Sequence, residues 1–298
     1  MKQEDGGLCG LTSGEHRRLA DLLRNAARDR RPVEPLSSWT PQLTIGDGVR
    51  IRDMLIGRRA AEGSRLIGAK VSFGGAGAGG RFRLPEPRVG WLTDDMLLPS
   101  AVVDLGTLIR PRVEPRVAFA LARPPRGSFA TPSDLLTATA HVFPCLEILD
   151  SRYDRDELDA ADEIADNCAT AALLIGEGVA TPAEGHLRRL RVHVHADVAV
   201  RVRHGPAAVV SPLETAGWLG RLLIEEGHRL ERGTLLVAPL GRAAIQLTPR
   251  TRLSVHFGVL GSLELQAVGE LSDTTEPAGP WTTQSAPEAV VQEGPSER

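Results

Sequence analysis

The chain has 298 residues, of which 42% are hydrophobic, and it carries a formal net charge of −3. This length suffices for one large domain or two small ones with a sizeable core. The small charge predicts no strong attraction to nucleic acid or to an anionic membrane, and no apolar run reaches the roughly 18 residues that a membrane helix needs.

The N-terminal part is predicted to be helical. Residues 12–15, Thr-Ser-Gly-Glu, have the pattern of a capping box, and leucines recur at helical spacing from there to Pro32. A second helix is expected with Asp47 as its cap. A strand over 66–73 then leads into the glycine-rich segment 74–80. We interpret that segment as a flexible connector and not as a phosphate loop, because extended residues follow it where a phosphate loop needs a helix.

Strand patterns dominate the middle of the chain. Residues 113–121 are apolar apart from Glu114 and Arg116, which a period of two places on one face. Glu147 lies inside a further predicted strand, 142–149. The two strands therefore carry charged groups within otherwise apolar runs, where an unpaired charge is costly.

A capped amphipathic helix is predicted over 211–227, and a hairpin over 252–268. Residues 271–298 are rich in Ser, Thr, Pro, Gly and Glu and are expected to be disordered. Helices come first and a strand-rich body follows, so we predict an α+β fold. Its expected parts are an N-terminal helical segment (1–64), a catalytic core (65–270) and the tail.

Lysine is nearly absent from the sequence. Of 35 basic residues only Lys2 and Lys70 are lysine, and Lys2 lies in a polar terminal segment. Lysine can lose its proton in a desolvated pocket, whereas arginine in practice cannot. Lys70 is therefore a candidate for proton transfer. The alternative is that it is a surface lysine retained by chance, which the sequence does not distinguish from a functional one.

Several stretches, taken in order, form a recognisable set. They are Leu-Ile-Gly-Ala-Lys-Val (66–71), Gly-Trp-Leu-Thr-Asp-Asp-Met (90–96), Pro-Arg-Val-Glu-Pro-Arg-Val-Ala (111–118), Phe-Pro-Cys-Leu-Glu-Ile-Leu-Asp-Ser-Arg (143–152) and Asp-Glu-Ile-Ala-Asp-Asn (162–167). The ordered set resembles the 2-keto-4-pentenoate hydratase / 2-oxo-hexenedioate decarboxylase family of the fumarylacetoacetate hydrolase superfamily. The resemblance covers roughly residues 15–270 and implies a helical N-terminal part followed by a mixed β-roll core.

The resemblance implies a lyase that acts on 2-oxo acids and their enols. Members hydrate a dienol acid, decarboxylate an oxo-diacid or cleave a carbon–carbon bond, with magnesium or manganese held by carboxylates. A hard cation of this kind prefers oxygen ligands and stabilises an enolate. The expected partners are a small-molecule substrate and further copies of the chain in a homo-oligomer, with no nucleic acid or membrane. The N-terminus without a signal-peptide pattern and three scattered cysteines favour a cytoplasmic location.

The metal motif of the family is altered in this sequence. Glu114 and Glu147 match two of its glutamates, but Arg116 stands at the middle ligand position. Arg88 stands where an acidic residue is usual, and Ala238-Pro239 replaces a common Thr-Gly pair. At about 4 Å and an effective dielectric near 20, each repulsive unit pair costs about 4 kcal/mol, so a dication beside two guanidinium groups is disfavoured. We therefore predict a site without metal and no other cofactor.

Three consequences of this alteration stay open. In the first, Arg116 and Arg88 take over the binding of a carboxylate or enolate, Glu114 and Glu147 orient them, and Lys70 moves protons. In the second, the arginines and glutamates neutralise each other, and the pocket directs another reaction such as a cyclisation or isomerisation in natural-product biosynthesis. In the third, the chemistry is lost, and the fold serves as a binding protein with buried ion pairs.

Other polar residues complete the predicted site. Asp162 and Asp166 match acidic positions of the family, either as partners of Lys70 or as caps of a local turn. His141 lies near Glu147 in the sequence and is a candidate for substrate binding. A pair of histidines at 193 and 195 shares one face of a predicted strand, but no third ligand lies nearby, so exposed strand residues are the preferred interpretation. The predicted catalytic residues are Lys70, Glu114, Arg116 and Glu147, and the predicted substrate-binding residues are Arg88, Asp162, Asp166 and His141.

Overall fold

A computed structural model gives the structure of the chain, and the predicted α+β class is confirmed. The structure describes residues 10–73, 87–125, 127, 129, 131–180, 182–188, 190–204, 211–241, 243–271, 282–284 and 289–291. Lys2 and the glycine-rich segment 74–80 lie outside these residues. None of the described helices is both long and apolar enough to cross a membrane.

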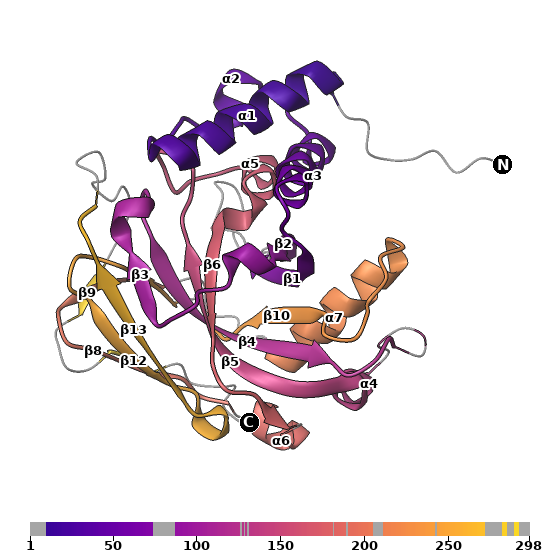
Figure 1. The fold of residues 1–298 in the computed structure, drawn as a ribbon, viewed down its shortest axis with the longest axis vertical. Helices are drawn as coiled ribbons and strands as arrows, with labels where there is room; N and C mark the ends of the chain where they lie inside the picture. The colour runs from indigo at the N-terminus through magenta and orange to yellow at the C-terminus, as the bar shows by residue number, and fades with distance from the viewer. Residues whose placement is uncertain are drawn as a thin grey trace, which may run out of the picture.

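The N-terminal helices α1, α2 and α3 form one layer at an end of the molecule, above the sheets (Figure 1). The capping box at the start of α1 (Ser13–Asp29) is confirmed, with Thr12 as the cap and Glu15 as its partner. α2 (Leu36–Trp39) and α3 (Ile45–Ala61) follow. The cap of α3 is Thr44 and not Asp47, which instead completes a second capping box from three residues further on.

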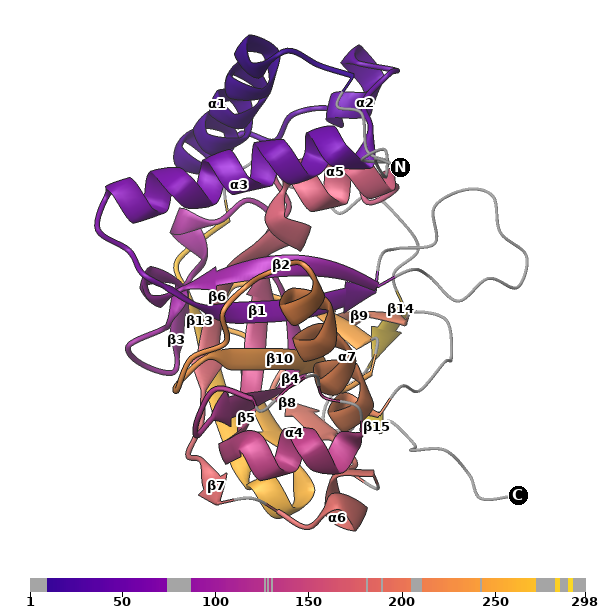
Figure 2. The ribbon, with the colours of Figure 1, turned by 90° about the vertical axis from the view of Figure 1, so that its right-hand side faces the viewer.

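The helical layer is fastened to a later segment, α5 (Ala160–Ala165), which lies along α3 (Figure 2). A Cβ atom on Gly48 of α3 would come within 2.5 Å of the Ala161 carbonyl oxygen, so only glycine permits this close crossing. Ser37 of α2 donates to the Asp162 carboxylate from its backbone nitrogen, at 3.0 Å. α2 and α3 therefore hold α5 in place, directly before the turn that follows it.

In the described residues the strands form two sheets. The larger runs in the order β14-β9-β11-β4-β10-β1-β2, with β5 on β4 and both β6 and β7 on β5. The smaller runs β15-β8-β12-β13-β3. The bounds are β1 Leu66–Phe73, β2 Pro87–Thr93, β3 Val102–Asp104, β4 Arg112–Leu121, β5 Thr139–Leu149, β6 Thr170–Ile175, β7 Val179–Ala180, β8 His193–Ala196, β9 Val200–His204, β10 Leu235–Pro239, β11 Ala243–Gln246, β12 Arg252–His256, β13 Ser262–Val268, β14 Thr282–Gln284 and β15 Ala289–Val291.

Short helices connect and cover the sheets. α7 packs on β10 and β1, with α4 and α6 beside it (Figure 2). The largest apolar cluster involves both sheets and these helices, and a smaller one gathers on the face of β1, β4, β5 and β10 described below. The remaining bounds are α4 Pro132–Ala138, α6 Glu184–Arg188 and α7 Pro212–Glu225, with the 3₁₀ turns η1 Asp94–Met96, η2 Leu105–Thr107, η3 Asn167–Ala169 and η4 Gly258–Leu260.

The C-terminal segment 271–298 is described only in part. Its two short strands β14 and β15 pair with β9 and β8. The rest of the segment beyond residue 271 lies outside the described residues, so the disorder expected there and the three-part division of the chain stay predictions.

Candidate active site

Sheet register brings charged side chains to one face of the larger sheet. β4 and β5 are antiparallel, with Glu114 directly opposite Glu147, so the two side chains lie on the same face. Lys70 on β1 pairs with Val237 on β10, which in turn pairs with Ala118 on β4. Because Ala118 lies four residues after Glu114, the period of two places Lys70 on that face as well.

Four of these side chains form a line of alternating charge, which we name the ion-pair chain: Lys70, Glu147, Arg116 and Glu114. Lys70 Nζ lies 2.6 Å from Glu147 Oε1, and Arg116 Nη2 lies 2.7 Å from Glu147 Oε2. The same Nη2 lies 2.7 Å from Glu114 Oε2. The contacts of Glu147 are close ion pairs that are not aligned as regular hydrogen bonds. All four predicted catalytic residues therefore lie together, and their formal charges cancel.

Burial divides the ion-pair chain unequally. The side chains of Lys70, Arg116 and Glu147 are 0–1% exposed, whereas that of Glu114 is 20% exposed. Burial by itself would lower the pKa of Arg116, but the neighbouring carboxylates of Glu147 and Glu114 outweigh it and raise the pKa. Arg116 is thus a fixed positive charge between two glutamates.

Backbone carbonyls hold both cations in place. Arg116 Nη1 donates to the Val71 carbonyl oxygen at 2.7 Å, and Lys70 Nζ donates to the Cys168 carbonyl oxygen at 2.9 Å. Arg116 Nε is buried and has no acceptor among the described residues. A buried donor without a partner costs free energy, which an oxygen atom of a ligand would recover.

Space for the lysine side chain comes from Gly90 on β2, which lies opposite Lys70 in the antiparallel pairing. A Cβ atom at Gly90 would lie 2.9 Å from Lys70 Cε and 3.0 Å from the Asn167 carbonyl oxygen. Any larger residue would push the lysine away from Glu147. Sequence reasoning missed this role, although Gly90 heads one of the stretches that carry the resemblance.

The carbonyl that holds Lys70 belongs to a left-handed turn. Asn167, Cys168 and Ala169 have φ angles of 49°, 52° and 59°. Glycine adopts such angles easily and asparagine tolerates them, but they are unfavourable for other residues. The Asn167 side chain stabilises the turn by clamping the backbone of Trp91: it accepts from Trp91 N at 2.7 Å and donates to Trp91 O at 2.9 Å. Strain held in this way is typical of functional sites.

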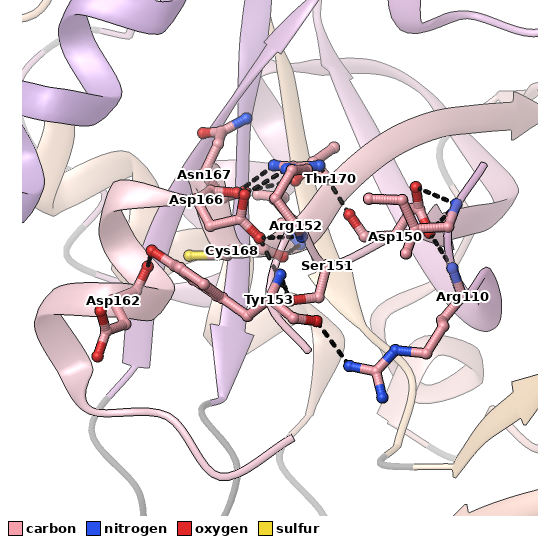
Figure 3. A network of polar contacts seen from close by, with 12 residues as sticks. Arg110, Asp150, Ser151, Arg152, Tyr153, Asp162, Asp166, Asn167, Cys168 and Thr170 are labelled. Atoms are coloured by element: carbon pink, nitrogen blue, oxygen red, sulfur yellow. Dashed lines mark hydrogen bonds and ion pairs between the residues drawn. The ribbon is translucent and has the colours of Figure 1, made fainter. Parts of the chain in front are cut away.

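A polar network supports the turn from the side of the β5 end (Figure 3). Asp166 accepts from the backbone nitrogen of Arg152 at 3.1 Å and pairs with its guanidinium. Complete burial raises the pKa of Asp166 to about 6, although Arg152 opposes the rise. Asp150 accepts from the backbone nitrogen of Arg110 at 2.7 Å, and Tyr153 donates to the Asp162 carbonyl oxygen at 3.1 Å. The network therefore links α5 and the turn to the end of β5.

Two predicted substrate-binding residues thus have other partners. Asp162 and Asp166 are buried. The Asp162 carboxylate accepts from Ser37, and the Asp166 carboxylate contacts Ser151 and Arg152. Neither carboxylate has a described contact with Lys70. Of the two interpretations left open, support of local structure fits them better than direct contact with the lysine.

The structure also shows where the other two predicted substrate-binding residues lie. Arg88 pairs with Glu163 of α5. His141 is exposed and lies six residues before Glu147 on the same strand, about 20 Å away at the strand rise of about 3.3 Å per residue. The structure therefore does not bring His141 to the ion-pair chain. The histidines at 193 and 195 are exposed on β8 of the other sheet, as expected.

Known proteins resemble the chain over most of its length. A 4-oxalocrotonate decarboxylase of a Pseudomonas species is 31% identical over 239 residues, covering 78% of this chain and 92% of that protein. A 2-hydroxypent-2,4-dienoate hydratase of Pseudomonas putida is 31% identical over 213 residues, covering 70% of this chain and 95% of the hydratase. The chain belongs to the 2-keto-4-pentenoate hydratase / 2-oxo-hexenedioate decarboxylase family. No family model matches the chain.

A solved structure agrees with this family membership. The 4-oxalocrotonate decarboxylase from Pseudomonas putida G7, complexed with magnesium and adipate, superposes with a TM-score of 0.75 at 25% identity, over 88% of this chain and all of that one. The fold is therefore of the fumarylacetoacetate hydrolase type. The curated relatives are named as decarboxylases and hydratases, which are lyases, so the chain is a lyase-type enzyme.

The ion-pair chain does not fit the magnesium that this family member carries. Magnesium requires oxygen ligands at about 2.0–2.1 Å in near-octahedral geometry. Here the guanidinium of Arg116 stands between Glu114 and Glu147, within 2.7 Å of an oxygen of each. Within the described ranges, no group of three or more His, Cys, Asp or Glu side chains is placed to hold a metal ion. A carboxylate site for a dication would first have to expel the arginine.

Proposed function

We propose that the chain is a lyase that acts on a 2-oxo acid or another enolisable carbonyl compound without a metal ion. The relatives include a 2-hydroxypent-2,4-dienoate hydratase, whose substrate is by its name the enol of a 2-oxo acid. The observation that carries the proposal is the position of Arg116, whose Nη2 contacts Glu114 and Glu147 at once. A guanidinium in this position supplies fixed positive charge for a developing enolate.

Three members of the ion-pair chain have a task in this proposal. Arg116 binds a carboxylate or enolate oxygen through donors that its protein partners leave free, including the buried Nε. Glu147 orients Arg116 and Lys70 because it contacts both. Lys70 takes part in proton transfer as a donor to the substrate. Its burial and its carbonyl partner fix the ammonium in one position, as proton transfer requires.

A second reaction class is favoured by the charge balance of the same residues. The ion-pair chain is neutral as a whole, and a neutral pocket discriminates less against large substrates of low charge than a site built around a dication. A cyclase or isomerase of natural-product biosynthesis on this fold would use Arg116 and Lys70 on an enolisable carbonyl group without adding water or releasing carbon dioxide.

Turnover assays separate these functions. Purified protein is incubated with 2-hydroxypent-2,4-dienoate and with 2-oxo-hept-4-ene-1,7-dioate, in EDTA or in magnesium chloride, and loss of the dienol absorbance is followed. We expect turnover that EDTA does not reduce and that Lys70→Met abolishes. Activity that appears only with magnesium would contradict the proposal. Folded protein that leaves both compounds unchanged would favour the cyclase or isomerase.

A further inference from the structure

Glu114 differs from the other members of the ion-pair chain in having a free oxygen. Its Oε2 accepts from Arg116, whereas its Oε1 has no hydrogen-bond or ion-pair partner among the described residues. Its side chain is 20% exposed, against 0–1% for the other three. Within this cluster, only Glu114 combines an unoccupied carboxylate oxygen with access from outside.

Glu147 has no free oxygen that could receive a proton from a substrate. One of its oxygens lies 2.6 Å from Lys70 and the other 2.7 Å from Arg116. Its side chain is also fully buried. The task that this geometry gives Glu147 is to keep both cations in place.

Lys70 is likewise poorly placed to act as the initial base. Its Nζ lies 2.6 Å from a Glu147 oxygen and donates to the Cys168 carbonyl oxygen at 2.9 Å, and its side chain is fully buried. Two of its three N–H groups face these partners, which leaves one for a ligand. Lys70 is thus equipped to donate a hydrogen bond or a proton, and the base has to be another group.

We infer that Glu114 is the catalytic base, which takes a proton from C-3 of a bound 2-oxo acid, while Lys70 and Arg116 hold the resulting enolate oxygen. This inference rests on the proposed function and adds the division of labour within the ion-pair chain. The C-3–H bond breaks and its proton moves to Glu114. The electron pair of that bond forms the C-2–C-3 double bond, and the carbonyl π pair moves onto the C-2 oxygen.

The charge balance of the cluster explains why this arrangement works without a dication. Before the step the four formal charges cancel. Once Glu114 has accepted the proton, Lys70, Arg116 and Glu147 leave a net charge of plus one beside the enolate, which carries the matching new negative charge. Proton transfer to Glu114 therefore leaves the site with a net positive charge. This charge lies next to the enolate oxygen, where the negative charge of the product develops, and stabilises it.

Hydrogen–deuterium exchange tests the inference without knowledge of the natural substrate. The full chain is incubated with 2-oxopentanoate in deuterium oxide containing EDTA, and the gain in mass of the recovered acid measures exchange at C-3. Glu114→Gln keeps an oxygen that can accept from Arg116 but removes the basic carboxylate. We expect it to slow exchange by about 10²–10⁴-fold, the usual contribution of a general base. Glu264→Gln, an exposed change on β13, is the matched control and should exchange at the unchanged rate.

Chemical rescue distinguishes a base from a merely structural residue. Glu114→Ala opens space for a small carboxylate, and added formate is expected to raise its exchange rate at least tenfold, with thermal unfolding confirming that the variant is folded. Exchange by Glu114→Gln at more than a tenth of the unchanged rate, or no effect of formate on Glu114→Ala, would overturn the inference and leave the proposed function standing. No exchange by the unchanged chain would overturn both.

Discussion

Glu147 is the residue whose loss should cost most stability. In Glu147→Gln the side chain keeps its size, but Lys70 and Arg116 stay buried without the carboxylate that lies 2.6 and 2.7 Å from them. Removing one partner of a buried ion pair costs about 3–5 kcal/mol, and here one carboxylate serves two cations, so we expect about 5 kcal/mol. At about 2–4 °C per kcal/mol for a chain of this size, the Tm should fall by about 10–20 °C.

Urea unfolding followed by tryptophan fluorescence measures this loss, with Glu264→Gln as the exposed control that should change stability by less than about 0.5 kcal/mol. A double-mutant cycle with Lys70→Met adds a second measurement. The double variant should be less destabilised than the sum of the single variants, by about 1–3 kcal/mol, because each single change leaves a buried charge unpaired. A loss below about 1 kcal/mol in Glu147→Gln would refute the buried ion-pair chain.

Three further predictions follow from the site and its support. Arg116→Glu restores a third carboxylate, so magnesium should stabilise this variant and raise its Tm. A magnesium concentration 100 times the Kd would add about 2.7 kcal/mol to the free energy of unfolding. The wild-type protein should not respond, and its stabilisation by magnesium would contradict the altered site. Because burial raises the folded-state pKa of Asp166 to about 6, the folded state binds this proton more tightly than the unfolded state. The free energy of unfolding should therefore fall as pH rises from about 4 to about 6, by at most about 3 kcal/mol, and Asp166→Asn should lack this fall. Equal pH dependence in the wild-type protein and the variant would show that the pKa of Asp166 is not raised by folding. Gly90→Ala should displace Lys70, lower activity and reduce the free energy of unfolding by about 1–3 kcal/mol. Gly57→Ala, with open space around it in α3, is the control and should raise the free energy of unfolding by up to about 1 kcal/mol. A Gly90→Ala variant of unchanged stability would disprove the steric argument.

Local patterns singled out side chains that the structure brings together in the candidate site. The period of two along a strand placed Glu114 and Arg116 on one face, and the rarity of lysine singled out Lys70. What no local pattern contains is the register of β4 against β5, which sets Glu147 opposite Glu114. The family resemblance supplied that pairing in the prediction, because it placed both glutamates in one site.

The features that local patterns did not foresee have separate physical origins. Arg88 meets Glu163, 75 residues further on and on a helix, where neither spacing nor periodicity relates the two. The left-handed turn was missed because only its first residue, Asn167, favours such angles, whereas Cys168 and Ala169 have no such preference. His141 is close to Glu147 in the sequence, but the strand rise alone separates the two side chains.

The complete burial of Lys70 has a practical consequence. Cells fed isotope-labelled lysine would make a protein labelled at two positions only, Lys2 and Lys70. The second is fully enclosed, so its ammonium protons are shielded from rapid loss to bulk water. A single magnetic-resonance signal would then report on the centre of the site, and each added compound could be judged by whether that signal moves.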